Sequence, residues 1–401
     1  MRLSLLQLQK KIDKTLPSKH RFAFVQVSDV DAITVHMKFT INKKMDKSVA
    51  FRGRVVKILI PRAGRTYFNV CNAVLDKMLK GRKLKDYFTA QTGIARKDGS
   101  VIRACVYSRR NVLDEKIVET EEKNANKSPL SVEDINGGIV NFDKNGVIFP
   151  TGKVKNAKRP IIMWIHGGGY AMGSPEQEFY FVKRILKAVD AIVVSPEYTR
   201  STEASYPHAI EDCYAALVWV KENAEKLGSD VNRIFVGGDS AGGGLCAAVC
   251  LYARDKKEVN VAFQMPLYPM LDDRPTRTNQ NNSTPCWDTQ SNNKAWKFYL
   301  GDLYGTDKVP YYAAPARATD LSGLPPAVSY VGDIEPFYAE TVDYMEKMKA
   351  AGVPVEYRVY KGCYHGFDVI CPESEPGKDA IQFLHDSLIY AAENYTAKQP
   401  E

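Results

Sequence analysis

The sequence lacks the features that mark a membrane-spanning, secreted or disulfide-rich protein. Apolar runs such as 161–165 and 191–194 are far shorter than the roughly 20 residues of a membrane-spanning helix. Polar residues interrupt the first apolar positions before a signal-peptide core can accumulate. The 8 cysteines are sparse for 401 residues, and no two of them have C-x-x-C spacing. We therefore expect a cytoplasmic protein without structural disulfides.

Net positive charge is confined to the N-terminal quarter of the chain. Residues 1–100 contain 22 Lys and Arg against 7 Asp and Glu, a net charge of +15, whereas the remaining residues carry −7. This asymmetry predicts a basic N-terminal extension and cap over residues 1–90 and a main domain over residues 91–401. No recognition motif for nucleic acid accompanies the charge, so nucleic acid is not an expected partner.

Two segments of the basic region have the apolar spacing of amphipathic helices. One begins at Met1 and includes Leu5, Leu8 and Ile12, and the other covers 71–79, just before a basic run. The favoured interpretation is a helical cap on the main domain with a solvated basic face. The alternative is reversible contact with an anionic membrane surface. Self-association into a homo-oligomer also stays open.

From about Gly93 onward, short apolar segments alternate with segments of helical spacing. Such alternation predicts an α/β fold with a mainly parallel sheet and helices on both faces. The expected strands are 101–107, 161–165, 191–194, 234–236, 261–265, 327–331 and 355–360, and the expected helices are 179–188, 209–227, 338–351, 378–392 and one that begins at Ala241. Residues 111–136 have the composition of a surface loop.

A glycine-flanked serine follows one expected strand and precedes a helix. The segment Gly238-Asp239-Ser240-Ala241-Gly242 matches G-x-S-x-G, in which small residues permit a tight turn that exposes the serine hydroxyl. A phosphate-binding loop is the competing interpretation of 237–244, but the segment lacks Gly-Lys-Ser/Thr. The pattern predicts a nucleophilic Ser240.

A second motif, His166-Gly167-Gly168-Gly169, directly follows the strand expected over 161–165. Consecutive glycines allow backbone N–H groups to approach a developing oxyanion without obstruction by a Cβ atom. Together with the N–H of Ala241, the residue after the nucleophile, this loop predicts an oxyanion hole.

The general base must come from 6 histidines, and His365 has the best position among them. It lies in a loop after the last expected strand, at the edge of the sheet that carries Ser240. The acid that orients it is expected after the strand 327–331, where Asp333 and Glu335 are the candidates. We favour Asp333, because it is nearer the strand end and the order Ser, Asp, His fits a hydrolase.

Taken together, these motifs resemble the hormone-sensitive lipase family of α/β-hydrolase carboxylesterases. The resemblance covers roughly residues 95–395 and rests on 166–169, 232–243, 268–273 and 364–367. It implies an α/β-hydrolase fold with an N-terminal helical cap, completed by a segment after the strand ending near Met265. It also implies that Gly168 and Gly169 donate with Ala241 and that Asp333 is the catalytic aspartate, although Ile334-Glu335-Pro336-Phe337 stands where the family usually has Pro-Leu-x-Asp.

The expected function is therefore hydrolysis of short- to medium-chain acyl esters by Ser240, Asp333 and His365, with no metal or organic cofactor. The expected partner is a small-molecule ester. Two alternatives stay open: a membrane-associated lipid hydrolase, and a catalytically silent ligand-binding receptor on the same fold. The candidates to line the acyl pocket are Tyr170, Met172, Trp287, Trp296 and Phe337, with packing in the core as an equal alternative for each aromatic.

Overall fold

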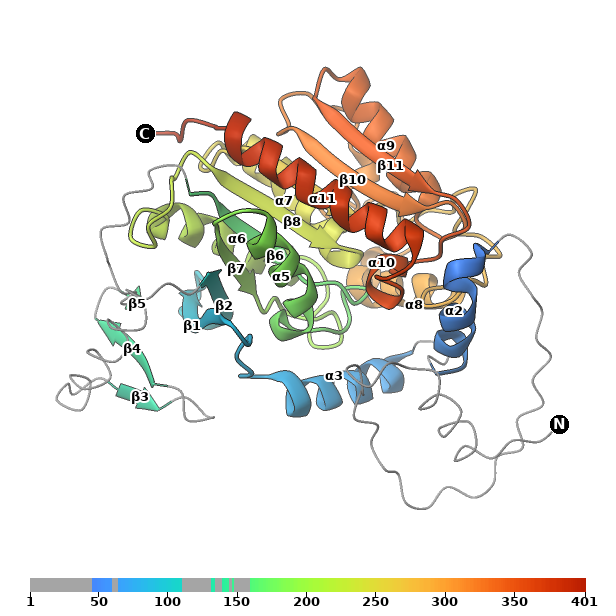
Figure 1. Cartoon of the computed structure of the whole chain (residues 1–401), viewed down its shortest axis with the longest axis horizontal. Helices are drawn as coiled ribbons and strands as arrows, with labels where there is room; N and C mark the ends of the chain where they lie inside the picture. The colour runs from blue at the N-terminus through green and yellow to red at the C-terminus, as the bar shows by residue number, and fades with distance from the viewer. Residues whose placement is uncertain (1–44, 60–63, 110–130, 134–138, 144–145, 148–158) are drawn as a thin grey trace, which may run out of the picture. The chain divides into compact units, whose positions relative to one another are not determined.

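The computed structural model describes residues 45–59, 64–109, 131–133, 139–143, 146–147 and 159–401 (Figure 1). Residues Lys43–Glu401 form one compact unit. The helix expected from Met1 to Ile12 and most of the loop expected over 111–136 lie outside the described residues.

An eight-stranded sheet forms the centre of this unit, in the order β1-β2-β7-β6-β8-β9-β10-β11. The pairs β1/β2 and β2/β7 are antiparallel, and every other neighbouring pair is parallel. The mainly parallel sheet is thus confirmed. Its strands are β1 (Tyr87–Ala95), β2 (Val101–Arg109), β6 (Ile161–Ile165), β7 (Ile192–Pro196), β8 (Ile234–Asp239), β9 (Phe263–Leu267), β10 (Ala327–Gly332) and β11 (Val355–Tyr360). A small antiparallel sheet contains β3 (Ser131–Glu133), β4 (Ile139–Asp143) and β5 (Gly146–Val147).

Helices cover both faces of the sheet, which explains why its central strands are buried and mostly apolar. Along β6, Ile161, Met163 and Ile165 pack in one hydrophobic cluster, and Ile162 and Trp164 pack in the other. The first cluster includes residues of α6 (His208–Asn223), α7 (Ala241–Lys256) and α9 (Tyr338–Ala350), and the second includes residues of α5 (Phe179–Ala188) and α11 (Glu375–Asn394). Figure 1 shows α5 and α11 in front of the central strands.

The described N-terminal helices, α2 (Lys47–Leu59) and α3 (Arg65–Leu79), pack on the same unit. On α3, the buried Asn72 donates from Nδ2 to the carbonyl of Ala171 at 3.0 Å and accepts from the N–H of Gly173 at 3.2 Å. The ring of Phe68, also on α3, contacts Phe298 of α8 (Thr289–Leu300) edge-on. The helix expected over 71–79 is confirmed as the second half of α3, whereas a domain boundary near residue 90 stays a prediction.

The remaining short elements are α10 (Phe367–Ile370) and the 3-10 turns η1 (Pro175–Glu178), η2 (Gly301–Leu303) and η3 (Pro315–Arg317). Among the helices of the described ranges, none is long and apolar enough to cross a membrane.

Candidate active site

Ser240 occupies a strained turn between β8 and α7. Its φ of 57° and ψ of −120° lie in a region that side-chain-bearing residues rarely adopt. A Cβ atom on Gly238 would lie 2.5 Å from the carbonyl oxygen of Gly242, and one on Gly242 would lie 2.1 Å from that of Ile165. The turn therefore requires glycine on both sides of the serine, and this explains the G-x-S-x-G pattern.

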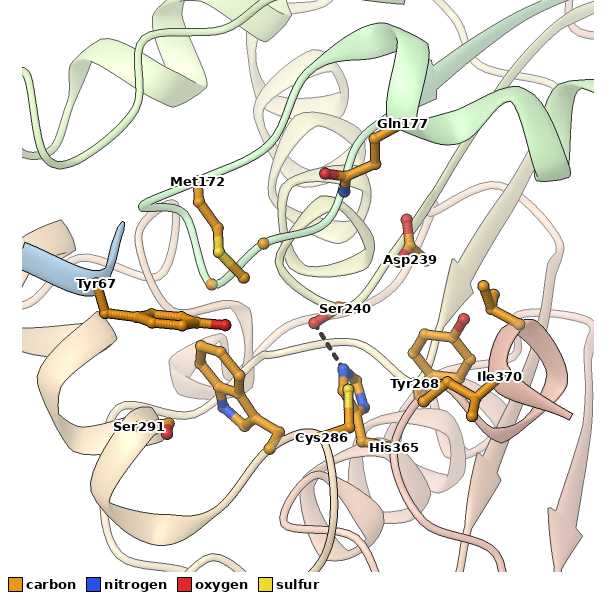
Figure 2. Close-up of a pocket in the computed structure, with 15 residues that line it drawn as sticks. Tyr67, Met172, Gln177, Asp239, Ser240, Tyr268, Cys286, Ser291, His365 and Ile370 are labelled. Atoms are coloured by element: carbon orange, nitrogen blue, oxygen red, sulfur yellow. Dashed lines mark hydrogen bonds between the residues drawn. The ribbon is translucent and has the colours of Figure 1, made fainter. Parts of the chain in front are cut away.

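His365 lies in the loop between β11 and α10, with its imidazole against Ser240 (Figure 2). Its Nε2 atom is 2.8 Å from the Ser240 Oγ atom. The rings of Tyr268 and Phe337 each contact the imidazole edge-on, with centroids 4.9 Å away. These contacts hold the ring between two aromatic side chains, and His365 is only 4% exposed. Ser240 and His365 are thus brought together as the sequence predicts.

Glu335, and not Asp333, contacts the other side of the His365 ring. The Nδ1 atom of His365 is hydrogen-bonded to Oε2 of Glu335, and Oε1 of that carboxylate accepts the N–H of Gly332 at 2.9 Å. Glu335 is fully buried. The Asp333 carboxylate instead accepts the N–H of Gly362 at 2.6 Å.

The expectation that Asp333 orients His365 is therefore corrected. Directly after β10, the N–H of Asp333 still bonds the carbonyl of Tyr360 on the neighbouring strand, so its side chain is held near the start of the loop. The chain then turns, and the longer Glu335 side chain contacts the imidazole. Sequence order alone could not distinguish two acids within the same turn.

The glycine loop after β6 lines the same cavity as Ser240. Gly168 and Gly169 have φ values of 120° and 62°, conformations that favour glycine. A Cβ on Gly168 would lie 2.0 Å from the carbonyl oxygen of Met172, and one on Gly169 would lie 2.4 Å from the Trp287 ring. Ala241 is the first residue of α7, so its N–H has no partner within the helix. These three N–H groups are the ones the sequence predicts for an oxyanion hole.

Two carboxyl groups, those of the buried Glu178 and the half-buried Asp239, lie next to the nucleophile. They are within hydrogen-bond reach of each other, and desolvation raises the pKa of both, that of Asp239 well above its ordinary range. Burial also lowers the pKa of the neighbouring His166 to about 4. His166 stacks on Tyr198, with ring centroids 4.1 Å apart, and its Nδ1 lies 2.9 Å from the carbonyl of Gly167. His166 is therefore uncharged at neutral pH, and its contacts are structural.

A cavity of about 190 Å³ opens next to Ser240 and His365. Of the residues expected to line it, Met172 and Trp287 do so. Tyr170, Trp296 and Phe337 do not belong to its lining and are buried, Phe337 against the His365 ring and the other two in the core. Sequence reasoning missed the cavity residues Tyr67, Gln177, Tyr268, Cys286, Ser291, Val369 and Ile370.

Tyr67 shows why such residues are hard to predict. It comes from α3, more than 100 residues away from the cavity's other lining side chains, and Figure 2 shows its ring extending toward the cavity beside Met172. Its apolar spacing on α3 marks it only as part of an amphipathic helix. Within the described ranges, no group of three or more His, Cys, Asp or Glu side chains could hold a metal ion.

A family profile described as the alpha/beta hydrolase fold matches residues 162–369, which is more than half of the chain. The chain belongs to the hormone-sensitive lipase family of α/β hydrolases. The matched region contains the glycine loop, Ser240, Glu335 and His365, and it begins at the strand that precedes the glycine loop.

Two named esterases are similar to this chain over about half of its length. Esterase LipI of Mycobacterium tuberculosis is 35% identical over 213 residues, which cover 53% of this chain and 66% of the relative. Carboxylesterase NlhH of the same organism is 36% identical over 212 residues, covering 52% and 66%. The chain thus spans slightly less than two thirds of the length of these relatives.

A solved bacterial heroin esterase is similar over a longer region of the chain. It superposes with a TM-score of 0.69 and 28% identity, covering 87% of this chain and 98% of that esterase. The α/β-hydrolase fold that the resemblance implies is therefore confirmed.

Proposed function

We propose that this chain is a serine carboxylesterase in which Ser240, His365 and Glu335 form the catalytic triad. The observation that carries the proposal is the continuous hydrogen-bonded series from the Ser240 hydroxyl through both ring nitrogens of His365 to the buried Glu335 carboxylate. Nucleophile, base and orienting acid are what acyl transfer needs. The named esterases LipI and NlhH support the same reaction class.

In the proposed mechanism, His365 removes the Ser240 proton as Oγ attacks the ester carbonyl carbon. The carbonyl oxygen becomes an oxyanion, held by the N–H groups of Gly168, Gly169 and Ala241. His365 then donates its proton to the departing alcohol oxygen, which leaves an acyl group on Ser240. Water, deprotonated by His365, attacks this acyl-enzyme and releases the acid.

Glu335 contributes by orienting His365 and by stabilising the imidazolium that forms in both steps. Its contact fixes the ring so that Nε2 faces Ser240 and Nδ1 carries a proton toward the carboxylate. The mechanism uses only side chains and backbone groups of this chain, so the proposal includes no cofactor.

The cavity's volume favours a short- to medium-chain acyl group. A cavity of about 150 Å³ is enough to hold benzene, and the one beside Ser240 measures about 190 Å³. Tyr67 and Met172 line it on one side (Figure 2), and Trp287 also belongs to its lining. We therefore place the acyl chain against these three side chains.

The experiment that tests the proposal measures hydrolysis of p-nitrophenyl esters from acetate to palmitate by the wild-type protein and by Ser240→Ala. The control is Ser387→Ala, because Ser387 lies on α11 and bonds only within its helix. We expect turnover that is highest for short or medium chains and at least about 10³-fold slower in Ser240→Ala.

Full activity of Ser240→Ala would refute the proposed nucleophile. A long-chain optimum would favour the lipid hydrolase alternative, and a folded wild-type protein that hydrolyses no ester would favour the silent receptor.

A further inference from the structure

Asp239 and Glu178 place two carboxyl groups in direct contact immediately behind the nucleophile. Asp239 ends β8 next to Ser240, and Glu178 ends the turn η1. Their side chains lie within hydrogen-bond reach of each other. Because a carboxylate is only an acceptor, two carboxyl groups in such contact form a hydrogen bond only when one of them carries a proton.

The other contacts of the pair identify the protonated partner. Glu178 accepts the Trp164 Nε1–H at Oε2, at 3.0 Å, and the Gln177 side-chain amide at Oε1, at 3.1 Å. A side chain that accepts hydrogen bonds at both oxygens is the carboxylate of the pair. The Oδ1 atom of Asp239 is buried and has no hydrogen-bond partner within the described residues. The proton therefore belongs on Asp239.

The surroundings also favour an uncharged Asp239. The charges that interact with it most strongly are those of the carboxyl groups Glu178 and Asp368. Tyr198, Tyr268 and Cys286 also interact with it, and His365 faces the adjacent Ser240. Arg184, a cation that interacts with Tyr268, is paired with Asp368 at 2.5 Å. Burial and the Glu178 charge accordingly raise the pKa of Asp239 well above its ordinary range.

The pair also contacts the glycine loop. A Cβ atom on Gly167 would lie 2.6 Å from Oδ2 of Asp239, so the carboxyl group packs directly on that loop. The Gln177 amide, which bonds Glu178, also reaches the carbonyl of Gly167 at 3.4 Å. Figure 2 shows Asp239 beside Ser240, on the side of Gln177.

We propose that a single proton, carried by Asp239 and donated to Glu178, keeps the side chain beside Ser240 uncharged and holds the glycine loop in place for the reaction. The inference rests on the proposed esterase function. Asp239 and Glu178 are then positioning residues. An ionised Asp239 would place a negative charge beside the glycine loop that must hold the oxyanion, and two negative charges close together in a site shielded from water repel each other strongly.

The test compares Asp239→Asn with Glu178→Gln in p-nitrophenyl acetate hydrolysis. An asparagine retains a donor toward Glu178, so the direction of the hydrogen bond survives. A glutamine at 178 removes the anion that accepts the proton, and the pKa of Asp239 falls. We expect both variants to lose kcat, with Glu178→Gln losing about tenfold more and KM little changed in either.

The pH profile distinguishes this role from a merely structural one. In the wild-type protein, kcat should fall at alkaline pH as the shared proton is lost. That decline should disappear in Asp239→Asn and move to lower pH in Glu178→Gln. The exposed exchanges Asp343→Asn and Glu346→Gln are matched controls, since Asp343 pairs with Arg277 and Glu346 contacts Lys349 and the Tyr357 hydroxyl, all on the surface.

Infrared spectroscopy provides a measurement that does not depend on activity. The carbonyl absorption of protonated carboxyl groups should weaken in Asp239→Asn relative to the wild-type protein and to Asp343→Asn. If Asp239→Asn does not fold, the displaced alkaline decline in Glu178→Gln decides instead. Equal losses of kcat with unaltered alkaline behaviour, or an undiminished absorption in Asp239→Asn, would overturn the proposal. If the wild-type protein hydrolyses no ester, the esterase proposal fails, while the infrared comparison still tests the shared proton.

Discussion

The Nδ1 atom of His365 is hydrogen-bonded to Glu335, two residues beyond the aspartate that sequence order favours. Asp333 instead holds the N–H of Gly362 at the start of the loop that carries His365. The two acids therefore have different roles within one turn, and the difference can be measured.

Glu335→Gln should lower kcat by about 10³- to 10⁴-fold, because the amide no longer stabilises the imidazolium or selects the ring's productive tautomer. Asp333→Asn is the matched control, and we expect less than about a tenfold loss, since its contact is with the loop backbone. Steady-state kinetics on p-nitrophenyl acetate makes the comparison. The reverse order of losses would show that Asp333 is the catalytic acid.

Trp287→Ala should shift the preferred acyl chain toward longer lengths. The indole packs against Gly169 and closes the apolar side of the cavity, so its removal opens space for further methylene groups. Each buried methylene contributes about 0.8 kcal/mol, so two more should raise kcat/KM for the longer ester relative to acetate by about tenfold. Trp219→Ala, on α6 and away from the cavity, is the control. An unchanged ratio would place the acyl chain elsewhere.

Gly168→Ala should reduce kcat by about 10²- to 10³-fold, because the new Cβ would collide with the backbone of Met172 and displace an oxyanion-hole donor. Gly352→Ala is a matched control: its φ of 82° is also positive, but nothing lies within 4 Å of the added atom. That control should cost about 1 kcal/mol of stability and leave kcat unaltered. Equal kinetic effects would argue against the glycine loop's role.

His166 should make the protein less stable as pH falls. Burial lowers the pKa of His166 to about 4 in the folded state, whereas the unfolded value is about 6.5. Between these values the unfolded chain binds the extra proton, so the contribution of His166 is complete above about pH 6.5 and is lost toward pH 4, amounting to about 3 kcal/mol. Urea unfolding of the wild-type protein and of His166→Phe from pH 7 to 4 measures this contribution of His166 to stability. Parallel pH dependences in the two proteins would contradict this assignment.

Glu340 should have the opposite effect on the pH dependence of stability. Its carboxyl group is buried and accepts the N–H of Leu271 at 2.7 Å, and burial raises its pKa well above the ordinary range. The unfolded chain releases this proton above about pH 4.5, whereas the folded chain keeps it, so stability is lost as pH rises. The free energy of unfolding of Glu340→Gln should therefore rise relative to that of the wild-type protein between pH 5 and pH 8, by about 1 kcal/mol or more. The exposed Glu346→Gln exchange should show no such trend in thermal unfolding.

The sequence predicts most of the sheet because each central strand is a short apolar segment between helical ones. The strand 161–165 and the helix 179–188 have the observed bounds, and Val355–Tyr360 is also a strand as expected. In contrast, β1 was not predicted, because Thr89, Gln91 and Thr92 interrupt its apolar residues. It is an edge strand, stabilised by pairing with β2 along its whole length.

The parts of the candidate site that could be predicted are those whose backbone conformation requires particular residue types. Ser240 and the glycine loop require their own local conformations, so the pattern of residues indicates them directly. Glu335 and Tyr67 depend instead on how a turn and a distant helix pack, and no local pattern reports that packing. The contact between Asp239 and Glu178 likewise joins two segments about 60 residues apart and is evident only in the folded chain.

The most direct test of the central claim is covalent labelling with diethyl p-nitrophenyl phosphate, followed by mass spectrometry of the intact protein and its peptides. The account predicts one diethylphosphoryl group per chain, located on Ser240, with concurrent loss of esterase activity and much slower labelling in His365→Ala. An active protein that remains unlabelled at Ser240, or that loses activity through labelling of another residue, would contradict it.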